Sequence, residues 1–193
     1  MIEENLREVL RSIEESRARR TVANPDEPVL LVAVTKNHEV AEMREAIDGG
    51  VTDIGENRIQ EAREKFDTLE RDAVWHLIGH LQKNKAKYAV RLFDLIHSVD
   101  TLELAAALDK EAEKIGKVQD VLVQVNLAKE ASKSGIYEED LQPMLEAVDA
   151  LPHLHLCGLM CIAPNYDDVE ETRPLFRHMY EIFQRIKGFP WKT

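Results

Sequence analysis

The sequence predicts an α/β fold in which parallel strands alternate with helices. Short apolar segments typical of buried strands begin near residues 29, 52, 74, 95, 121 and 155, so successive strands start 23, 22, 21, 26 and 34 residues apart. This is the spacing of βα units around a parallel sheet that is buried on both faces. Two architectures fit, a (β/α)₈ barrel and an open doubly wound sheet. No Gly-x-Gly-x-x-Gly follows the first strand, which disfavours a doubly wound sheet that binds a dinucleotide. A full barrel has eight βα units and typically about 250 residues, so the six units found here are two short of it.

Each predicted element has a local signal. We expect strands near 29–34, 52–55, 74–78, 95–98, 121–125 and 155–160, and helices over 1–20, 39–48, 58–69, 84–91, 101–115, 138–150 and 172–187. Gly49-Gly50 ends the second of these helices. The segment Asp100-Thr101-Leu102-Glu103 has the spacing of a capping box with Asp as its first residue, and Pro174 suits a first helical turn.

Two helices show a clear apolar face. The first carries Ile2, Leu6, Val9, Leu10 and Ile13, and the last carries Leu175, Phe176, Met179, Phe183 and Ile186.

Composition narrows the class of protein. The 193 residues suggest one domain, residues 1–193, and the balance of 25 Lys and Arg against 36 Asp and Glu gives a formal charge of -11. Such a charge argues against binding to nucleic acid or to an anionic membrane surface. No signal peptide or apolar stretch of transmembrane length is apparent. Cys157 and Cys161 would lie too far apart on a strand for a disulfide, so a reducing, cytoplasmic setting is expected.

Lys36 is the most informative residue for function. It ends the apolar run 29–35, where it would lie half out of water. Desolvation disfavours the ammonium form of a lysine, so the amine becomes available as a nucleophile toward a carbonyl. The alternative is a lysine that extends into solvent along its aliphatic stem.

Other polar residues also follow predicted strands. In both candidate architectures the site lies at the carboxyl ends of the strands. These ends carry Lys36, Glu56-Asn57, Gly79-His80, Ser98 to Asp100, Asn126 and Met160-Cys161. One lysine among amide, imidazole and hydroxyl groups indicates a carbonyl-binding or Schiff-base site, although strand ends are also polar simply because loops meet water.

Several other motifs favour structural interpretations. His76 within a strand is more often a hydrogen-bonded core residue than an acid or base, whereas His80 follows Gly79 at a loop start and is a better functional candidate. His153, His155, Cys157 and Cys161 resemble metal ligands, but a continuous strand rises about 3.3 Å per residue, so the outer two would lie roughly 26 Å apart. Zinc bonds are about 2.0–2.3 Å long, which excludes one metal held by all four. The segment 132–135 could bind an anion through backbone N–H groups, but a plain loop is the commoner explanation.

The strand-end motifs together resemble one known family, the pyridoxal phosphate homeostasis proteins (YggS/PROSC type). The segments that carry the resemblance occur in the family's order: Val32-Ala33-Val34-Thr35-Lys36, Gly55-Glu56-Asn57-Arg58-Ile59-Gln60-Glu61, Trp75 to Lys85, His97-Ser98-Val99-Asp100, Gln124-Val125-Asn126, Lys133-Ser134-Gly135-Ile136 and Gly158-Leu159-Met160. The resemblance runs from about residue 29 to residue 188.

The resemblance implies a fold and a cofactor. The fold is a TIM-type (β/α) barrel like the alanine racemase N-terminal domain, here with about six βα units and without the last two. The cofactor is pyridoxal 5′-phosphate, held as an aldimine on Lys36 with Asn57 and Met160 near its ring, and His80 is a further candidate cofactor-binding residue. Members have no established catalytic turnover and influence vitamin B6 and amino-acid balance.

This chain departs from the family pattern at its C-terminal end. Members continue with a Ser-Met-Gly-Met-Ser type segment and an Arg-Val-Gly-Thr type segment, which supply the phosphate cradle and an arginine facing the pyridine nitrogen. Neither segment occurs here. Two alternative functions therefore stay open, a pyridoxal-phosphate-dependent amino-acid racemase and a cofactor-free lyase that uses Lys36 on a carbonyl substrate.

Overall fold

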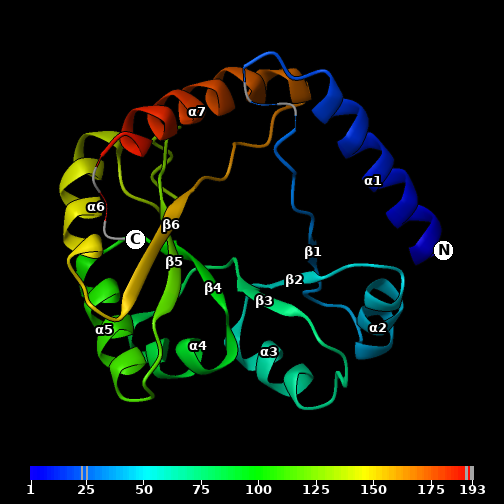
Figure 1. Ribbon diagram of the computed structural model, residues 1–193, viewed down its shortest axis with the longest axis horizontal. Helices are drawn as coiled ribbons and strands as arrows, with labels where there is room; N and C mark the ends of the chain where they lie inside the picture. The colour runs from blue at the N-terminus through cyan, green and yellow to red at the C-terminus, as the bar shows by residue number, and fades with distance from the viewer. Residues whose placement is uncertain (23, 25, 190, 192–193) are drawn as a thin grey trace. The chain divides into compact units, whose positions relative to one another are not determined.

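A computed structural model describes residues 1–22, 24, 26–189 and 191 of the chain (Figure 1). These residues form two compact units, Met1–His76 and Leu77–Thr193. Both units follow the predicted alternation of strand and helix, and the expectation of one domain over 1–193 remains a prediction. None of the helices in the described part of the chain is long and apolar enough to cross a membrane.

The first unit opens with a helix and then builds parallel strands. Its elements are α1 (Ile2–Ala18), β1 (Val32–Val34), α2 (Val40–Asp48), β2 (Asp53–Glu56), α3 (Ile59–Phe66) and β3 (Val74–Leu77), whose last residue belongs to the second unit. Val34 of β1 lies opposite Gly55 of β2 in a parallel ladder. The backbone N–H of Val74 donates to the carbonyl of Thr52 at 2.9 Å, so the strand order in this unit is β1-β2-β3.

The ends of the elements in this unit are close to those predicted. The helix α2 stops at Gly49, and Gly50 has a φ of 109°, a left-handed conformation that side chains disfavour. The strand β1 begins at residue 32 rather than 29, and the preceding Leu30 is 62% exposed. On the predicted apolar face of α1, Leu6 is buried, whereas Val9 stays exposed.

The second unit continues the same pattern. Its elements are the 3₁₀ turn η1 (Lys83–Lys85), α4 (Ala86–Leu92), β4 (Leu95–Val99), α5 (Leu102–Glu113), β5 (Gln119–Gln124), η2 (Glu138–Asp140), α6 (Leu141–Asp149), β6 (Leu154–Met160), η3 (Val169–Thr172) and α7 (Arg173–Lys187). The strands β4, β5 and β6 are neighbours and parallel. Figure 1 shows α4, α5 and α6 on one side of these strands. Fully buried side chains such as Ile96, Leu108 and Leu145 form the core between the strands and the helices.

One predicted helix cap is displaced by a residue. The N-cap of α5 is Thr101, whose side-chain oxygen accepts from the N–H of Leu104 at 3.2 Å, rather than Asp100. Asp100 instead accepts a hydrogen bond from the backbone N–H of Gly135 at 3.2 Å. The capping-box prediction was therefore wrong in register, because a hydroxyl one residue later reaches the same helix start and Asp100 has a partner in another loop.

The last helix begins as predicted. Pro174 lies in the first turn of α7, and Met179, Ile182 and Ile186 are buried on one face of the helix. Phe176 from the predicted apolar face is 49% exposed. The amphipathic pattern therefore located the helix correctly, and part of its apolar face is exposed.

Candidate functional site

Lys36 lies in the turn that follows β1. Thr35 is buried, Lys36 is exposed, and Asn37 has a φ of 62°, so the chain leaves the sheet abruptly at this point. The expectation that Lys36 lies half out of water was wrong, because the strand ends two residues earlier and the left-handed turn directs the chain into solvent. The Lys36 side chain has no hydrogen bond or ion pair within the described part of its own unit. Its primary amine is therefore accessible to a solute.

A buried polar network holds the backbone before Lys36. The hydroxyl of Thr35 donates to Oε1 of Glu56 at 2.6 Å. The ammonium group of Lys65 donates to the same carboxylate oxygen at 2.8 Å and to the backbone carbonyl of Thr35 at 2.7 Å. The residue immediately before the candidate nucleophile is therefore fixed through both its side chain and its carbonyl.

The same network also holds the backbone after Lys36. The third bond of the Lys65 ammonium group goes to Oε1 of Glu61 at 2.7 Å. That oxygen also accepts from the backbone N–H of Asn37 at 2.5 Å. Because Thr35 and Asn37 are both restrained, the position of the Lys36 α-carbon is set by α3 and β2 even though its side chain is free in this unit.

The network changes the interpretation of Glu56. The sequence placed this residue on a polar rim, but it is completely buried, and so is Ser98. Both predictions were wrong, because a side chain within a short strand alternates sides and can point into the core as easily as out of it. Sequence analysis also missed Lys65 and Glu61. Their spacing of four residues on one helix was the available signal, but it is shared by many exposed pairs.

The network should make stability depend on pH at both extremes. Burial alone lowers the pKa of Lys65, but hydrogen bonds to Glu56 and Glu61 outweigh it and raise that pKa, while the hydrogen bond from Lys65 lowers the pKa of Glu61. The raised pKa of Lys65 stabilises the fold below about pH 10.5, and this contribution is lost at more alkaline pH. The lowered pKa of Glu61 stabilises the fold above about pH 4.5, and this contribution is lost as the pH falls. Below about pH 4.5 we expect the free energy of unfolding of Glu61→Gln to fall less steeply with falling pH than that of the starting protein. Urea unfolding of both proteins across this range measures the effect, and parallel curves would contradict it.

Asn57 and His76 lie on strands of the first unit. Asn57 follows β2 as Lys36 follows β1, so both lie at the carboxyl edge of a parallel strand pair, and Asn57 is half-buried. His76 is buried, and its Nε2 lies 2.8 Å from Oδ1 of Asp53. This confirms the prediction of a hydrogen-bonded core histidine and leaves Asn57 as the neighbouring candidate.

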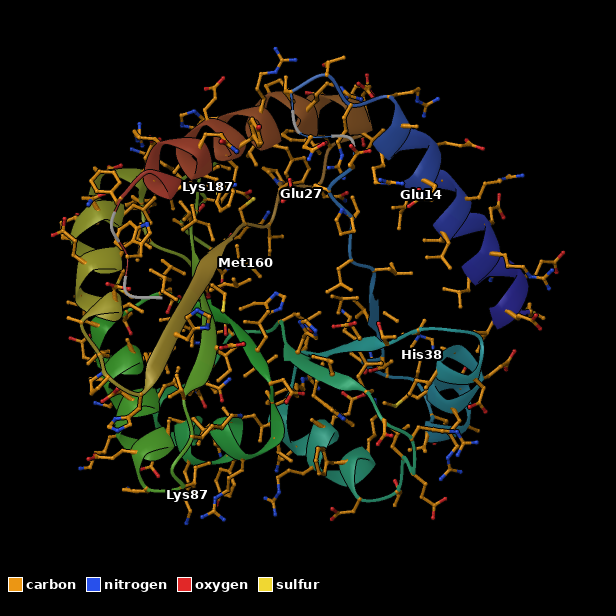
Figure 2. All side chains as sticks on the ribbon, viewed as in Figure 1. Glu14, Glu27, His38, Lys87, Met160 and Lys187 are labelled. Carbon is orange, nitrogen blue, oxygen red and sulfur yellow. The ribbon has the colours of Figure 1, made fainter. Side chains whose placement is uncertain are left out.

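The remaining candidates lie in the second unit. Nδ1 of His80 lies 3.2 Å from the hydroxyl of Ser134, and the His80 side chain is exposed. Met160 ends β6, where Figure 2 labels it, and its carbonyl accepts from the N–H of Val125 at 2.8 Å. Asn126 is buried, and its amide donates to the carbonyl of Lys133 at 3.2 Å. Asn126 therefore follows β5 and Met160 ends β6, so both candidates lie at carboxyl ends of strands as predicted.

The loop at 132–135 is structural rather than an anion cradle. The N–H of Gly135 is already used by Asp100, so it does not point to a ligand. Gly135 has a φ of 117°, and a Cβ at this position would lie 2.8 Å from the backbone nitrogen of Asn126. Glycine is therefore required here by close packing of two backbones, as the plain-loop interpretation predicts.

Comparison with protein families supports the architecture. Residues 11–192 match the family model of the alanine racemase N-terminal domain. The chain is 33% identical over 189 residues to the pyridoxal phosphate homeostasis protein of Pasteurella multocida, which covers 96% of this chain and 80% of that protein. It is 44% identical over 138 residues to the protein of the same name from Synechocystis, covering 70% of this chain and 63% of that one.

Solved structures show the same fold. The chain is similar to PipY of Synechococcus elongatus, solved with PLP bound, with a TM-score of 0.81 and 37% identity over 97% of this chain and 82% of that one. Alanine racemase of Clostridium difficile matches with a TM-score of 0.70 over 96% of this chain and 48% of that one, and its 17% identity indicates the fold alone. The predicted TIM-type α/β fold is thereby confirmed. The chain belongs to the alanine racemase N-terminal-domain family, together with relatives named pyridoxal phosphate homeostasis protein.

Proposed function

We propose that this chain binds pyridoxal 5′-phosphate through Lys36 and acts in vitamin B6 and amino-acid homeostasis. The observation that carries the proposal is the accessible amine of Lys36 on a backbone that Thr35 and Asn37 hold in place. The names of the relatives and the PLP-bound state of PipY support the choice of cofactor. The aldehyde of pyridoxal phosphate supplies an electrophilic carbon, to which a primary amine can bond with loss of water.

The residues of the first unit fit this aldehyde. Lys36 offers a primary amine without a competing partner in its unit, and the buried Lys65 cannot compete because its ammonium group already donates three hydrogen bonds. Asn57 lies at the same strand edge and offers an amide for a polar contact. Met160 and His80 complete the proposed set of cofactor-binding residues on the basis of the family resemblance.

We propose a carrier rather than a catalyst. The relatives are named for homeostasis and not for a reaction. A racemase of this fold needs a second positioned base. The family resemblance implies that racemases take this base, a tyrosine, from an added β-domain. The cytoplasm is the proposed location, since both cysteines are free thiols, as is usual in a reducing compartment.

Covalent attachment should be specific to Lys36. We expect borohydride reduction of the chain with added pyridoxal phosphate to fix one adduct, which intact mass and peptide mapping place on Lys36. Lys83 and Lys85 are the matched controls, because they are also exposed and differ in lacking a restrained strand-end backbone. Equal labelling of these lysines would overturn the proposed site, absence of any adduct would overturn the cofactor, and sustained interconversion of L- and D-alanine would overturn the carrier role.

A further inference from the structure

Three potential metal ligands of different chemistry converge on β5 and β6, at a place that the proposed function does not use. Within the described residues, one ligand atom each from Asp120, His155 and Cys157 lies within 4.8 Å of the others. Nδ1 of His155 lies 2.8 Å from Oδ1 of Asp120 and 3.4 Å from Sγ of Cys157. The imidazole nitrogen is therefore between a carboxylate and a thiol.

The strand register brings this group together. Asp120 of β5 is directly opposite His155 of β6 in the parallel ladder. The register then shifts, so that Val121 faces Leu156 and Leu122 faces Gly158, which leaves Cys157 as an extra residue. Such a bulge re-aims a side chain and is common beside functional sites. Gly158 has a φ of 152°, which supplies the unusual backbone that the bulge requires.

We propose that Asp120, His155 and Cys157 bind one divalent transition-metal ion, with Zn²⁺ as the best match. Zn²⁺ accepts thiolate, imidazole and carboxylate ligands together, whereas Mg²⁺ and Ca²⁺ prefer oxygen alone. Three protein ligands leave a fourth position for water in a tetrahedral site. The side chains of His155 and Asp120 are 46% and 50% exposed, so an ion can enter from solvent.

Two of the three ligand pairs are close to the geometry of a zinc site, and the third pair, Asp120 and Cys157, lies within 4.8 Å. With zinc bonds of about 2.0–2.3 Å, ligand atoms at neighbouring corners of a tetrahedron lie about 3.3–3.6 Å apart. The separation of 3.4 Å between His155 and Cys157 already meets this condition. The separation of 2.8 Å between His155 and Asp120 is that of a hydrogen bond. It would open by about 0.5 Å when the ion replaces the shared proton, which the neutral ring then carries on Nε2.

The Cys157 thiol must lose its proton before it can bind a metal ion. Desolvation by its surroundings and the nearby Asp120 carboxylate raise the pKa of the Cys157 thiol to about 11, although the side chain reaches solvent. Reactive cysteines have a lowered pKa in electropositive surroundings. A bound cation would offset the negative charge of the Asp120 carboxylate and stabilise the Cys157 thiolate, and the thiol proton would pass to the buffer.

Neighbouring residues of the same type lie outside the group and provide controls. Cys161 is a half-buried free thiol beyond the end of β6. His153 precedes β6, and its backbone N–H donates to Asp109. The site also differs from the candidate cofactor residue Met160, which is five residues after His155 and hence about 16 Å away along the strand.

Titration with Zn²⁺ and Co²⁺ tests the proposal on the intact chain. We expect one equivalent of Zn²⁺ to bind in competition with a chromophoric chelator, and Co²⁺ to give the near-ultraviolet thiolate charge-transfer band and the intense visible bands of a tetrahedral site. Cys157→Ser should abolish the charge-transfer band, and His155→Gln should weaken Zn²⁺ binding at least about 100-fold, since even loss of a ligand's supporting partner costs about 10–100-fold.

The control variants separate this site from general metal scavenging. Cys161→Ser and His153→Gln should retain the stoichiometry and the Co²⁺ spectrum of the starting protein. Absence of Zn²⁺ binding, binding that survives Cys157→Ser, or equal losses in Cys157→Ser and Cys161→Ser would each overturn the proposal. Far-UV circular dichroism of every variant checks that a loss does not come from unfolding. Asp120→Asn hardly changes the size of the side chain and should also weaken Zn²⁺ binding, and unchanged binding in this variant would overturn the three-ligand site.

Discussion

Replacing Lys36 with alanine is expected to abolish the coloured, borohydride-sensitive complex with pyridoxal phosphate while leaving the fold intact. The amine is the group that would bond to the aldehyde, and alanine cannot replace it. The Lys36 side chain is exposed and lacks a partner in the described part of its unit, so its loss removes no buried contact there. Absorbance spectra and reduced-protein mass measure the loss, and far-UV circular dichroism checks the fold.

Two further variants make this test sharper. Lys36→Arg keeps the positive charge without a nucleophilic amine, so it should lose the complex as completely as Lys36→Ala if a covalent bond holds the cofactor. Lys83→Ala removes another exposed lysine and should leave the complex unchanged. A Lys36→Arg protein that keeps the coloured complex would contradict covalent attachment at this position.

Replacing Lys65 with methionine is expected to lower the free energy of unfolding by about 3–5 kcal/mol, the usual cost of removing one partner from a buried ion pair. Lys65 is 7% exposed, and its partner Glu56 is completely buried. The second oxygen of Glu56 has no hydrogen-bond partner in the described structure, so the remaining carboxylate would be left with the Thr35 hydroxyl alone. Urea unfolding followed by circular dichroism measures the change.

Matched variants distinguish the buried pair from an ordinary one. Arg71→Met breaks an exposed ion pair with Asp48 in the same unit and should change stability little. The double variant Lys65→Met with Glu56→Gln removes both charges and should recover part of the loss. If Lys65→Met were no more destabilising than Arg71→Met, the network would not be holding the Lys36 turn.

The sequence predicted the positions of helices and strands better than the contacts of individual residues. Helix and strand positions were predicted to within a few residues, because apolar periodicity and stop signals such as Gly49 and Pro174 act locally. The helix cap at residue 100 was misplaced because Asp100 and Thr101 are both suitable caps. Only the contact of Asp100 with Gly135, 35 residues away, decides between them.

For the metal-ligand group, too, the sequence predicted one part and missed another. The sequence correctly excluded one ion held by four residues spread along a strand, since strand geometry alone sets that limit. It could not find the group of three, because Asp120 enters through the pairing of β5 with β6 and Cys157 enters through a bulge. Neither the pairing nor the bulge has a local sequence pattern that sets its register.

Local periodicity and contiguous motifs were enough to predict the α/β alternation, the family and Lys36 as the candidate nucleophile. The folded structure was needed to show that Lys36 is exposed, that Glu56 is buried and that Lys65 connects β1 and β2. Burial and pairing of a charged side chain depend on which residues, often distant in the sequence, surround it in the fold. Lys65 lies 30 residues from the carbonyl that it holds, and no pattern within one segment contains that information.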